Sequence, residues 1–344
     1  MQLPQPRGPV TAALRQALAD APHKLPEQLV AMVCATGDPL VDEDLQLTLH
    51  LCYELHYRGF EDVDAGWEWH PSVLALRQAA ESRFEAALRR LVPLPAAVPP
   101  AQVPRALTAL IDADDGPELS RYVAGRATIE QFREFVTHRS IYHLREADPH
   151  TWAIPRLAGR PKAALVEIQA DEYGGGRAER MHAELFRTTM RELGLDTAYG
   201  AHLDAVPAVT LATNNVMSLF GLHRRLLGAI LGHLAVFEMT SSLPNRRYGN
   251  GLRRLGGNPD ATRFYDEHVE ADAVHEQIAA HDLCGAFCAD QPPRRRAEQT
   301  SLVLFGAACA LALDGRFAGH LLQRWADGAS SLRDQRLLVG ALGA

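Results

Sequence analysis

Leucines and alanines recur three and four residues apart along most of the chain, whereas the apolar and polar alternation typical of strands is almost absent. Asp42 and Asp44 stand where either could cap the second of the helices that this spacing predicts. The predicted helices span 10–19, 42–57, 71–91, 117–146, 161–172, 177–193, 209–240, 259–279 and 297–313. The pattern therefore predicts an all-α protein.

Prolines divide this series of helices. Residues 92–106 carry prolines at 93, 95, 99, 100 and 104, a density that helices and central strands do not tolerate. We therefore predict a smaller helical domain over residues 1–100 and a helical bundle over residues 101–344. Bundles of this kind place metal sites between facing helices. Residues 241–257, which are rich in glycine and asparagine, are predicted to form a loop between two of the helices.

One predicted helix carries metal-binding side chains on a single face. His268, Asp272 and His275 follow one another at intervals of four and three residues, which places them within about 60° of arc at 100° per residue. Two imidazoles and a carboxylate in such an arc can bind one metal site, and their mixed nitrogen and oxygen ligation suits iron. The alternative is a solvated polar face, because Glu267, Glu270 and further acidic residues surround them.

A second candidate lies around three consecutive glycines at 174–176, with Glu172 before them and His182 after them. Glycines inside a helical pattern cost about 1 kcal/mol each relative to alanine, so a compensating role is expected. A kink or close backbone approach could aim Glu172 and His182 at a common centre. An ordinary loop between two short helices explains the same residues equally well.

Glu238 is the best single candidate for a buried ligand. It follows Leu234, Val236 and Phe237 and precedes Met239, and a carboxylate in such an apolar stretch is costly to bury unless it is paired or binds a metal. Glu146, at the end of a predicted helix, is by itself ambiguous and would ordinarily be a surface residue.

Composition excludes several other classes of protein. The net charge of −7 and the lack of long basic runs argue against a nucleic-acid-binding protein. Five cysteines without a CxxC pair indicate neither a disulfide framework nor a zinc knuckle and favour a reducing cytoplasm. The N-terminus does not look like a signal peptide, and the apolar stretch 302–313 is shorter than a membrane span, so we expect a buried helix and no membrane partner.

Taken together, these segments resemble the haem-oxygenase-like diiron oxidases, whose helical bundle carries glutamates and histidines on its core helices and ends in a His-x3-Asp-x2-His run. The order and spacing of the acidic residues and histidines are similar to that family's. The segments EADPHTW at 146–152, DEYGGGR at 171–177 and TSSLPNRRYG at 240–249 also resemble an actinobacterial branch of iron-containing redox enzymes. The resemblance covers about residues 121–283.

The resemblance implies a haem-oxygenase-like bundle that holds two iron ions, with dioxygen as co-substrate. The positions that match the family's ligands are Glu146, Glu172, His182, Glu238, His268, Asp272 and His275. Glu238 is then expected to be catalytic as well. Relatives hydroxylate amine nitrogens, desaturate fatty acids or cleave amino acids, so we expect a small-molecule substrate from one of these classes. An external electron donor and a homodimer are further expectations.

The sequence also allows two other functions. One is a haem-oxygenase-fold protein with haem or cofactor-free chemistry, and another is a non-enzymatic iron-binding scaffold. The histidines outside the family's ligand positions are expected to be core or surface residues, with a role in orienting a ligand as the alternative; they are His138, His143, His150, His223 and His233. Arg246 and Arg247 are expected to lie in a solvated loop, with binding of a substrate carboxylate as the alternative.

Overall fold

The computed structural model describes residues 1–35 and 37–333, and for residues 270–274 it describes the backbone but not the side chains. The α-helices are, in chain order, α1 (Pro9–Leu18), α2 (Gln28–Cys34), α3 (Glu43–Glu54), α4 (Pro71–Leu91), α5 (Val103–Asp112), α6 (Leu119–Gly125), α7 (Ile129–His143), α8 (Asp148–Thr151), α9 (Gly159–Glu172), α10 (His182–Glu192), α11 (Ala208–Leu222), α12 (Leu227–Thr240), α13 (Ser242–Arg254), α14 (Pro259–Gln277), α15 (Ala286–Ala289) and α16 (Pro293–Ala326). A π-helix, η7 (Ile278–Gly285), continues α14, and the described residues contain no strand. The all-α prediction is confirmed.

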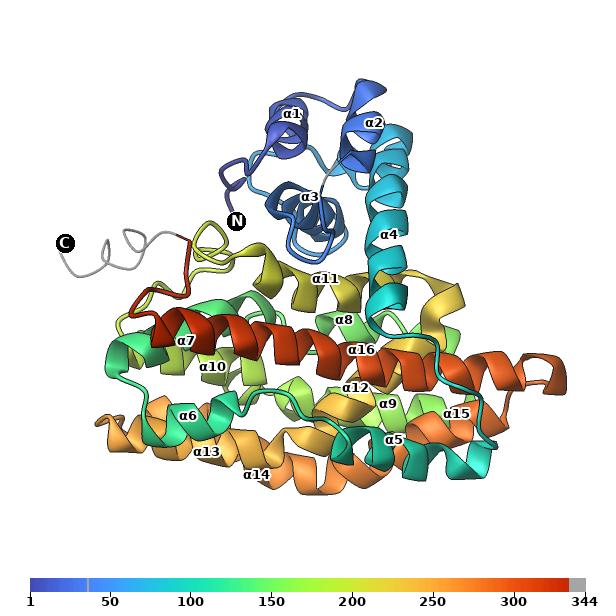
Figure 1. Ribbon diagram of the computed structural model, residues 1–344, viewed down its shortest axis with the longest axis vertical. Coiled ribbons are helices and arrows are strands. Elements are labelled where there is room, and N and C mark those ends of the chain that lie inside the picture. Colours follow the sequence, from blue (N-terminus) through green and yellow to red (C-terminus); the bar gives the residue numbers. More distant parts are fainter. Residues whose placement is uncertain (36, 334–344) are drawn as a thin grey trace.

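Glycines allow α12 and α16 to come into direct contact. The long α16 crosses the molecule beside α12 (Figure 1). A Cβ atom added to Gly232 of α12 would lie 1.9 Å from the Val303 carbonyl oxygen, and one added to Gly306 of α16 would lie 1.9 Å from the Ala229 carbonyl oxygen. Since no side chain fits at either position, these glycines bring the two backbones into direct contact and fix the position of α12.

Helices α1 to α4 lie together at one end of the molecule and rest on α11 (Figure 1). Their buried side chains belong to the same continuous apolar cluster as those of α11, α12 and α16. The division into domains at residue 100 therefore stays a prediction. Asp42 caps α3 by accepting a hydrogen bond from the Leu45 amide at 2.8 Å, one of the two capping arrangements expected.

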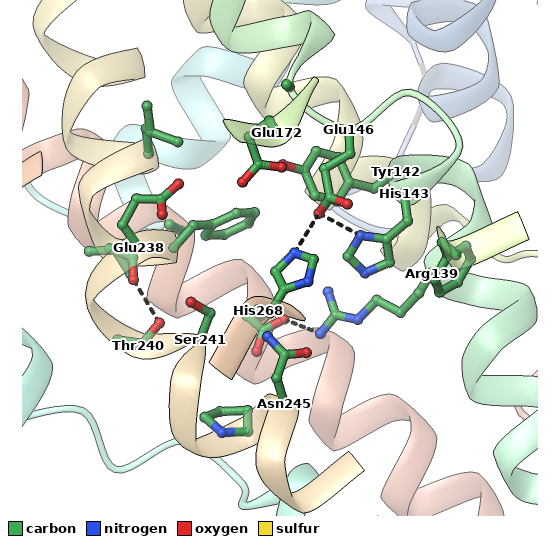
Figure 2. A pocket seen from close by; sticks show the side chains of 18 of the residues that line it. Arg139, Tyr142, His143, Glu146, Glu172, Glu238, Thr240, Ser241, Asn245 and His268 are labelled. Atoms are coloured by element: carbon green, nitrogen blue, oxygen red, sulfur yellow. Dashed lines mark hydrogen bonds and ion pairs between the residues drawn. The ribbon is translucent and has the colours of Figure 1, made fainter. Parts of the chain in front are cut away.

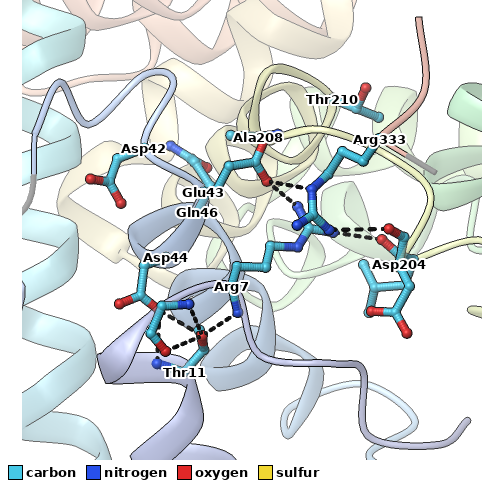
Figure 3. Close-up of polar contacts among 12 residues, drawn as sticks. Arg7, Thr11, Asp42, Glu43, Asp44, Gln46, Asp204, Ala208, Thr210 and Arg333 are labelled. Atoms are coloured by element: carbon cyan, nitrogen blue, oxygen red, sulfur yellow. Dashed lines mark hydrogen bonds and ion pairs between the residues drawn. The ribbon is translucent and has the colours of Figure 1, made fainter. Parts of the chain in front are cut away.

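Polar contacts also fasten this end to the bundle (Figure 3). Glu43 of α3 pairs with Arg7 at 2.7 Å and with Arg333 at 3.3 Å. Its second oxygen accepts a hydrogen bond from the Ala208 amide at 2.8 Å. Burial lowers the pKa of Arg7 to about 10. These residues form the Glu43 cluster, which joins the N-terminal segment, α3, the start of α11 and the segment after α16.

The structure corrects several predicted elements. The expected loop at 241–257 is mostly the helix α13. Its glycines are packing positions, since a Cβ on Gly251 would lie 2.7 Å from the Val123 carbonyl oxygen of α6. The predicted helices 117–146 and 209–240 are each broken into two, α5 begins inside the proline-rich segment, and α10 starts only at His182. In α13, close packing against α6 therefore overrides local propensity.

Among the described residues, α16 is long and apolar enough to cross a membrane by length and composition, and the bent pair that includes α12 and α13 passes the same criterion. The expected apolar stretch 302–313 is thus the middle of a helix of 34 residues. Of its most apolar window, 61% is buried inside the molecule. Core helices share this composition, so it is weak evidence of a membrane span.

Candidate metal centre

A cavity of about 170 Å³ lies between α7, α9, α12 and α14 (Figure 2). Acidic and histidine side chains gather on one part of its wall, and Arg139 of α7 with Asn245 of α13 on another. Aromatic and aliphatic side chains line the rest: Phe135, Phe186, Leu234, Val236, Phe237 and Leu311. The cavity therefore combines an apolar space with two polar regions.

Four of the predicted ligands form a first group. The possible ligand atoms of Glu146, Glu172, His182 and His268 all lie within 4.8 Å of one another, and all four residues are buried. His182 Nδ1 lies 2.9 Å from Glu172 Oε2, and His268 Nε2 lies 3.6 Å from Glu146 Oε1. The turn after α7, the end of α9, the start of α10 and the middle of α14 thus converge on one small volume.

A second group adjoins the first and shares Glu172. The possible ligand atoms of Glu172, Glu238 and His275 again lie within 4.8 Å of one another. Glu238 is 6% exposed, and its Oε2 lies 3.2 Å from His275 Nδ1. The side chain of the seventh predicted residue, Asp272, lies outside the described residues. The structure therefore brings together the six predicted residues whose side chains it describes.

The three glycines are what allow Glu172 and His182 to meet. Gly174, Gly175 and Gly176 all have positive φ, from 60° to 79°, a conformation that costs other residues about 1–2 kcal/mol. A Cβ on Gly174 would lie 2.6 Å from the backbone of Arg180 and Met181. The chain thus ends α9 just after Glu172 and folds tightly back to begin α10 at His182. Of the two readings of this segment, the close backbone approach is the one found.

His143, which the sequence does not identify as a ligand, contacts the predicted ligand Glu146 directly. Its Nδ1 donates a hydrogen bond of 2.7 Å to Glu146 Oε1, and its ring packs against Phe186 and Phe264. Burial raises the pKa of the Glu146 carboxyl, but His143 and then His268 more than offset this effect and hold that pKa well below its usual range. The spacing of three residues between His143 and Glu146 is the signal that could have indicated this contact.

The two histidines of α14 are oriented by the contacts of their ring nitrogens. His268 Nδ1 donates to the Phe264 carbonyl oxygen at 2.8 Å, which leaves Nε2 to face the carboxylates. His275 contacts Glu238 through Nδ1 and Asp171 through Nε2, at 3.2 Å and 2.9 Å. Burial lowers the pKa of His275, but these two carboxylates and Glu172 outweigh it and raise the pKa to about 9. Carboxylates therefore contact both ring nitrogens of His275.

The donor set fits a bound cation. Glu146 Oε2, Glu172 Oε2 and His182 Nδ1 are buried and have no hydrogen bond of acceptable geometry within the described structure. Buried polar atoms are normally satisfied, so carboxylate and imidazole atoms that face one another in this way indicate a shared cation. Carboxylate oxygens with imidazole nitrogens suit iron.

Of the other candidate histidines and arginines, His150 also lines the cavity. His150 and His233 form a buried pair, with His150 Nε2 3.3 Å from His233 Nδ1. Burial lowers the pKa of His150 to about 4, although Glu172 and Glu146 oppose this effect. Arg246 and Arg247 belong to α13, and Arg247 bonds to Ser120 at 3.2 Å. These residues form a helix and not the expected loop, although Arg246 is exposed to solvent as expected.

A comparison with protein families identifies the family of this chain. Residues 133–315 match the model of a family described as iron-containing redox enzymes. The chain belongs to this family. The matched range, more than half of the chain, includes every predicted ligand from Glu146 to His275. An iron-containing redox enzyme of the haem-oxygenase-like superfamily, as the sequence predicted, is therefore confirmed.

Two individual proteins are similar to this iron-containing redox enzyme. Nitrosourea synthase from Streptomyces achromogenes subsp. streptozoticus is 27% identical over 142 residues, which are 41% of this chain and 30% of that protein. The chain thus matches less than a third of the length of this curated relative. A solved domain of unknown function with a heme oxygenase-like fold, from Shewanella denitrificans OS217, is 15% identical, with a TM-score of 0.47. That alignment covers 67% of this chain and 94% of that domain.

Proposed function

We propose that this protein is a non-haem diiron oxidase that uses dioxygen to oxidise a small molecule. The observation that carries the proposal is the pair of buried donor groups that share Glu172. A haem protein needs chiefly one axial histidine, and a single-metal site needs only one of the two groups. Two adjoining groups with one carboxylate in common are what two neighbouring iron ions require.

Each residue has a role in this proposal. Glu146, His182 and His268 would hold one ion together with Glu172, and Glu238 and His275 would hold the other. Asp272 is proposed to join them on the strength of the sequence resemblance. Bound iron would supply the redox chemistry of dioxygen reduction. Glu238 faces the cavity from α12 beside the substrate space, which supports its proposed catalytic role (Figure 2).

The cavity supports a small, polar substrate. Arg139 and Asp314 form an ion pair of 2.8 Å on its wall, and Asn245 lies beside them. A cation and an anion side by side complement a molecule that carries a carboxylate and an amine. We therefore favour an amino acid or a related amine over a fatty acid.

The similarity to nitrosourea synthase, a protein named for a product with a nitrogen–nitrogen bond, supports oxidation at nitrogen. In such an N-oxygenation one oxygen atom of dioxygen enters an N–H bond, and the other leaves as water. Two protons and two electrons from an external donor complete the balance. The apolar side chains around the carboxylates would keep bulk water from this chemistry.

Anaerobic loading with Fe(II) followed by metal analysis tests the proposal. We expect about two irons per chain, no Soret band, and dioxygen consumption that a member of a panel of amines and amino acids accelerates. One iron or none per chain would overturn the diiron assignment. Bound haem would favour a haem-oxygenase-fold protein with haem chemistry. Iron uptake without any substrate-dependent consumption of dioxygen would favour a non-enzymatic iron-binding scaffold.

A homodimer and a cytoplasmic location remain proposals. The motivation for the dimer is the aromatic pair Trp67 and Trp69 in the N-terminal region. In the structure Trp67 is fully buried, whereas Trp69 is 64% exposed and available for a partner surface. Light scattering at micromolar concentration tests the dimer, and a monomer there would refute it.

A further inference from the structure

Glu146 belongs to a short turn whose backbone is strained. The turn connects α7 to α8, and its last residue, Ala147, has a φ of 72°. Among the described residues other than glycine, Ala147 alone has a positive φ. Such a conformation costs free energy and persists only where the surroundings enforce it. The position of Glu146 therefore depends on the contacts that hold this turn.

The residue before Glu146 is anchored to the N-terminal region. Arg145 Nη1 lies 3.2 Å from Oε2 of Glu54, the last residue of α3, and the two side chains are 1% and 0% exposed. The same Glu54 oxygen accepts a hydrogen bond of 2.9 Å from the Tyr199 hydroxyl. The Arg145 guanidinium also lies over the Tyr57 ring, with its central carbon 4.7 Å from the ring centre. Residues outside the cavity thus neutralise the charge of Arg145 and hold its side chain in position.

Two further hydrogen bonds hold the backbone of the turn. Arg58, which follows α3, donates to the Leu144 carbonyl oxygen at 3.4 Å. Gln169 of α9 donates to the Ala147 carbonyl oxygen at 3.1 Å and lies three residues before Glu172. The turn is therefore held on one side by the segment after α3 and on the other side by α9, the helix that ends at Glu172.

We propose that Glu54 is a positioning residue for the metal centre, acting through Arg145 to place Glu146. This inference rests on the proposed function, because it takes Glu146 as an iron ligand. A buried ion pair is weak evidence for stability alone, since well-packed apolar residues often replace such a pair without loss. Residues that orient ligands, in contrast, change metal affinity when they are replaced. The N-terminal helices are then part of the metal site and not only a neighbouring support.

Anaerobic Fe(II) titration of the full chain, with the melting temperature measured in parallel, tests this inference. In Glu54→Gln we expect one of the two binding steps to weaken by about tenfold or more, while the step that depends on Glu238 and His275 is retained. Glu43→Gln is the matched control, since it loosens an ion pair at the other end of α3 that does not touch the turn (Figure 3). It should leave both binding steps unchanged.

A double variant separates positioning from stability. Glu54→Gln leaves Arg145 buried without its charged partner and should lower the melting temperature, whereas Glu54→Leu with Arg145→Met removes both charges. We expect the double variant to recover the melting temperature but not the weakened iron step. Recovery of both together, or equal losses in Glu54→Gln and Glu43→Gln, would overturn the inference.

Iron binding by the native protein separates a failure of the proposed role of Glu54 from a failure of the proposed function. Two tight irons in the native chain and in Glu54→Gln alike would refute the role of Glu54 and leave the proposed function standing. No iron in the native chain would refute both.

Discussion

Glu172 and His182 lie ten residues apart in the sequence, yet Oε2 of one is 2.9 Å from Nδ1 of the other. Glu172 is also the residue that the two donor groups share. The consequences of removing different ligands should therefore be unequal.

Replacing the shared carboxylate should abolish the site, whereas replacing a carboxylate of one group should remove half of it. We expect Glu172→Ala to lose both irons and Glu238→Ala to retain about one per chain. Metal analysis after anaerobic loading measures both. Equal stoichiometry in the two variants would contradict the sharing of Glu172.

The glycine turn after Glu172 offers a test of geometry. In Gly174→Ala the new Cβ would meet the backbone of Arg180 and Met181, so the start of α10 and His182 must move. In Gly175→Ala nothing lies within 4 Å of the new atom, and only the strain of a positive φ, about 1–2 kcal/mol, applies. Iron affinity should therefore fall in the first variant and stay near native in the second, as followed by Fe(II) titration. Equal affinity in both would show that the turn does not set the site.

His143 should matter for iron although it is not a proposed ligand. In His143→Phe the ring still packs against Phe186 and Phe264, but the hydrogen bond to Glu146 is lost. Loss of such an orienting contact typically lowers metal affinity by about 10- to 100-fold. His223→Phe is a suitable control, since it removes a histidine–carboxylate pair of 2.9 Å with Glu81, and neither residue lines the cavity. Unchanged affinity in His143→Phe would rule out its orienting role.

The fold should be sensitive to acid through His138. Burial, and next the nearby charges of His320 and Arg139, hold the pKa of His138 well below 6.5. Because the unfolded chain takes up this proton near pH 6.5 and the folded chain does not, stability should fall as pH drops below about 6.5. His138→Asn should lower that slope by up to about 1.4 kcal/mol per pH unit. Urea denaturation at several pH values measures it, and a native slope in the variant would exclude this residue as a source.

Periodicity and side-chain chemistry were enough to predict much of this protein. The helix at 71–91 was predicted with the bounds of α4, because its apolar positions repeat without a break. His268 and His275 share a face of α14 because helical geometry depends only on spacing. Glu238 could be read as buried because its neighbours in the sequence are apolar.

Only the tertiary structure decided where these faces meet. The glycines of α13 indicate a loop until α6 is seen to pack against Gly251. Glu146 is ambiguous until His143, His268 and the strained turn enclose it, and the link from Glu54 to Arg145 joins residues 91 positions apart. Local spacing determines which side chains share one face of a helix, whereas contacts between distant segments arise only when the whole core packs. The types of donor were therefore readable from the sequence, but the sharing of Glu172 and the support from α3 were not.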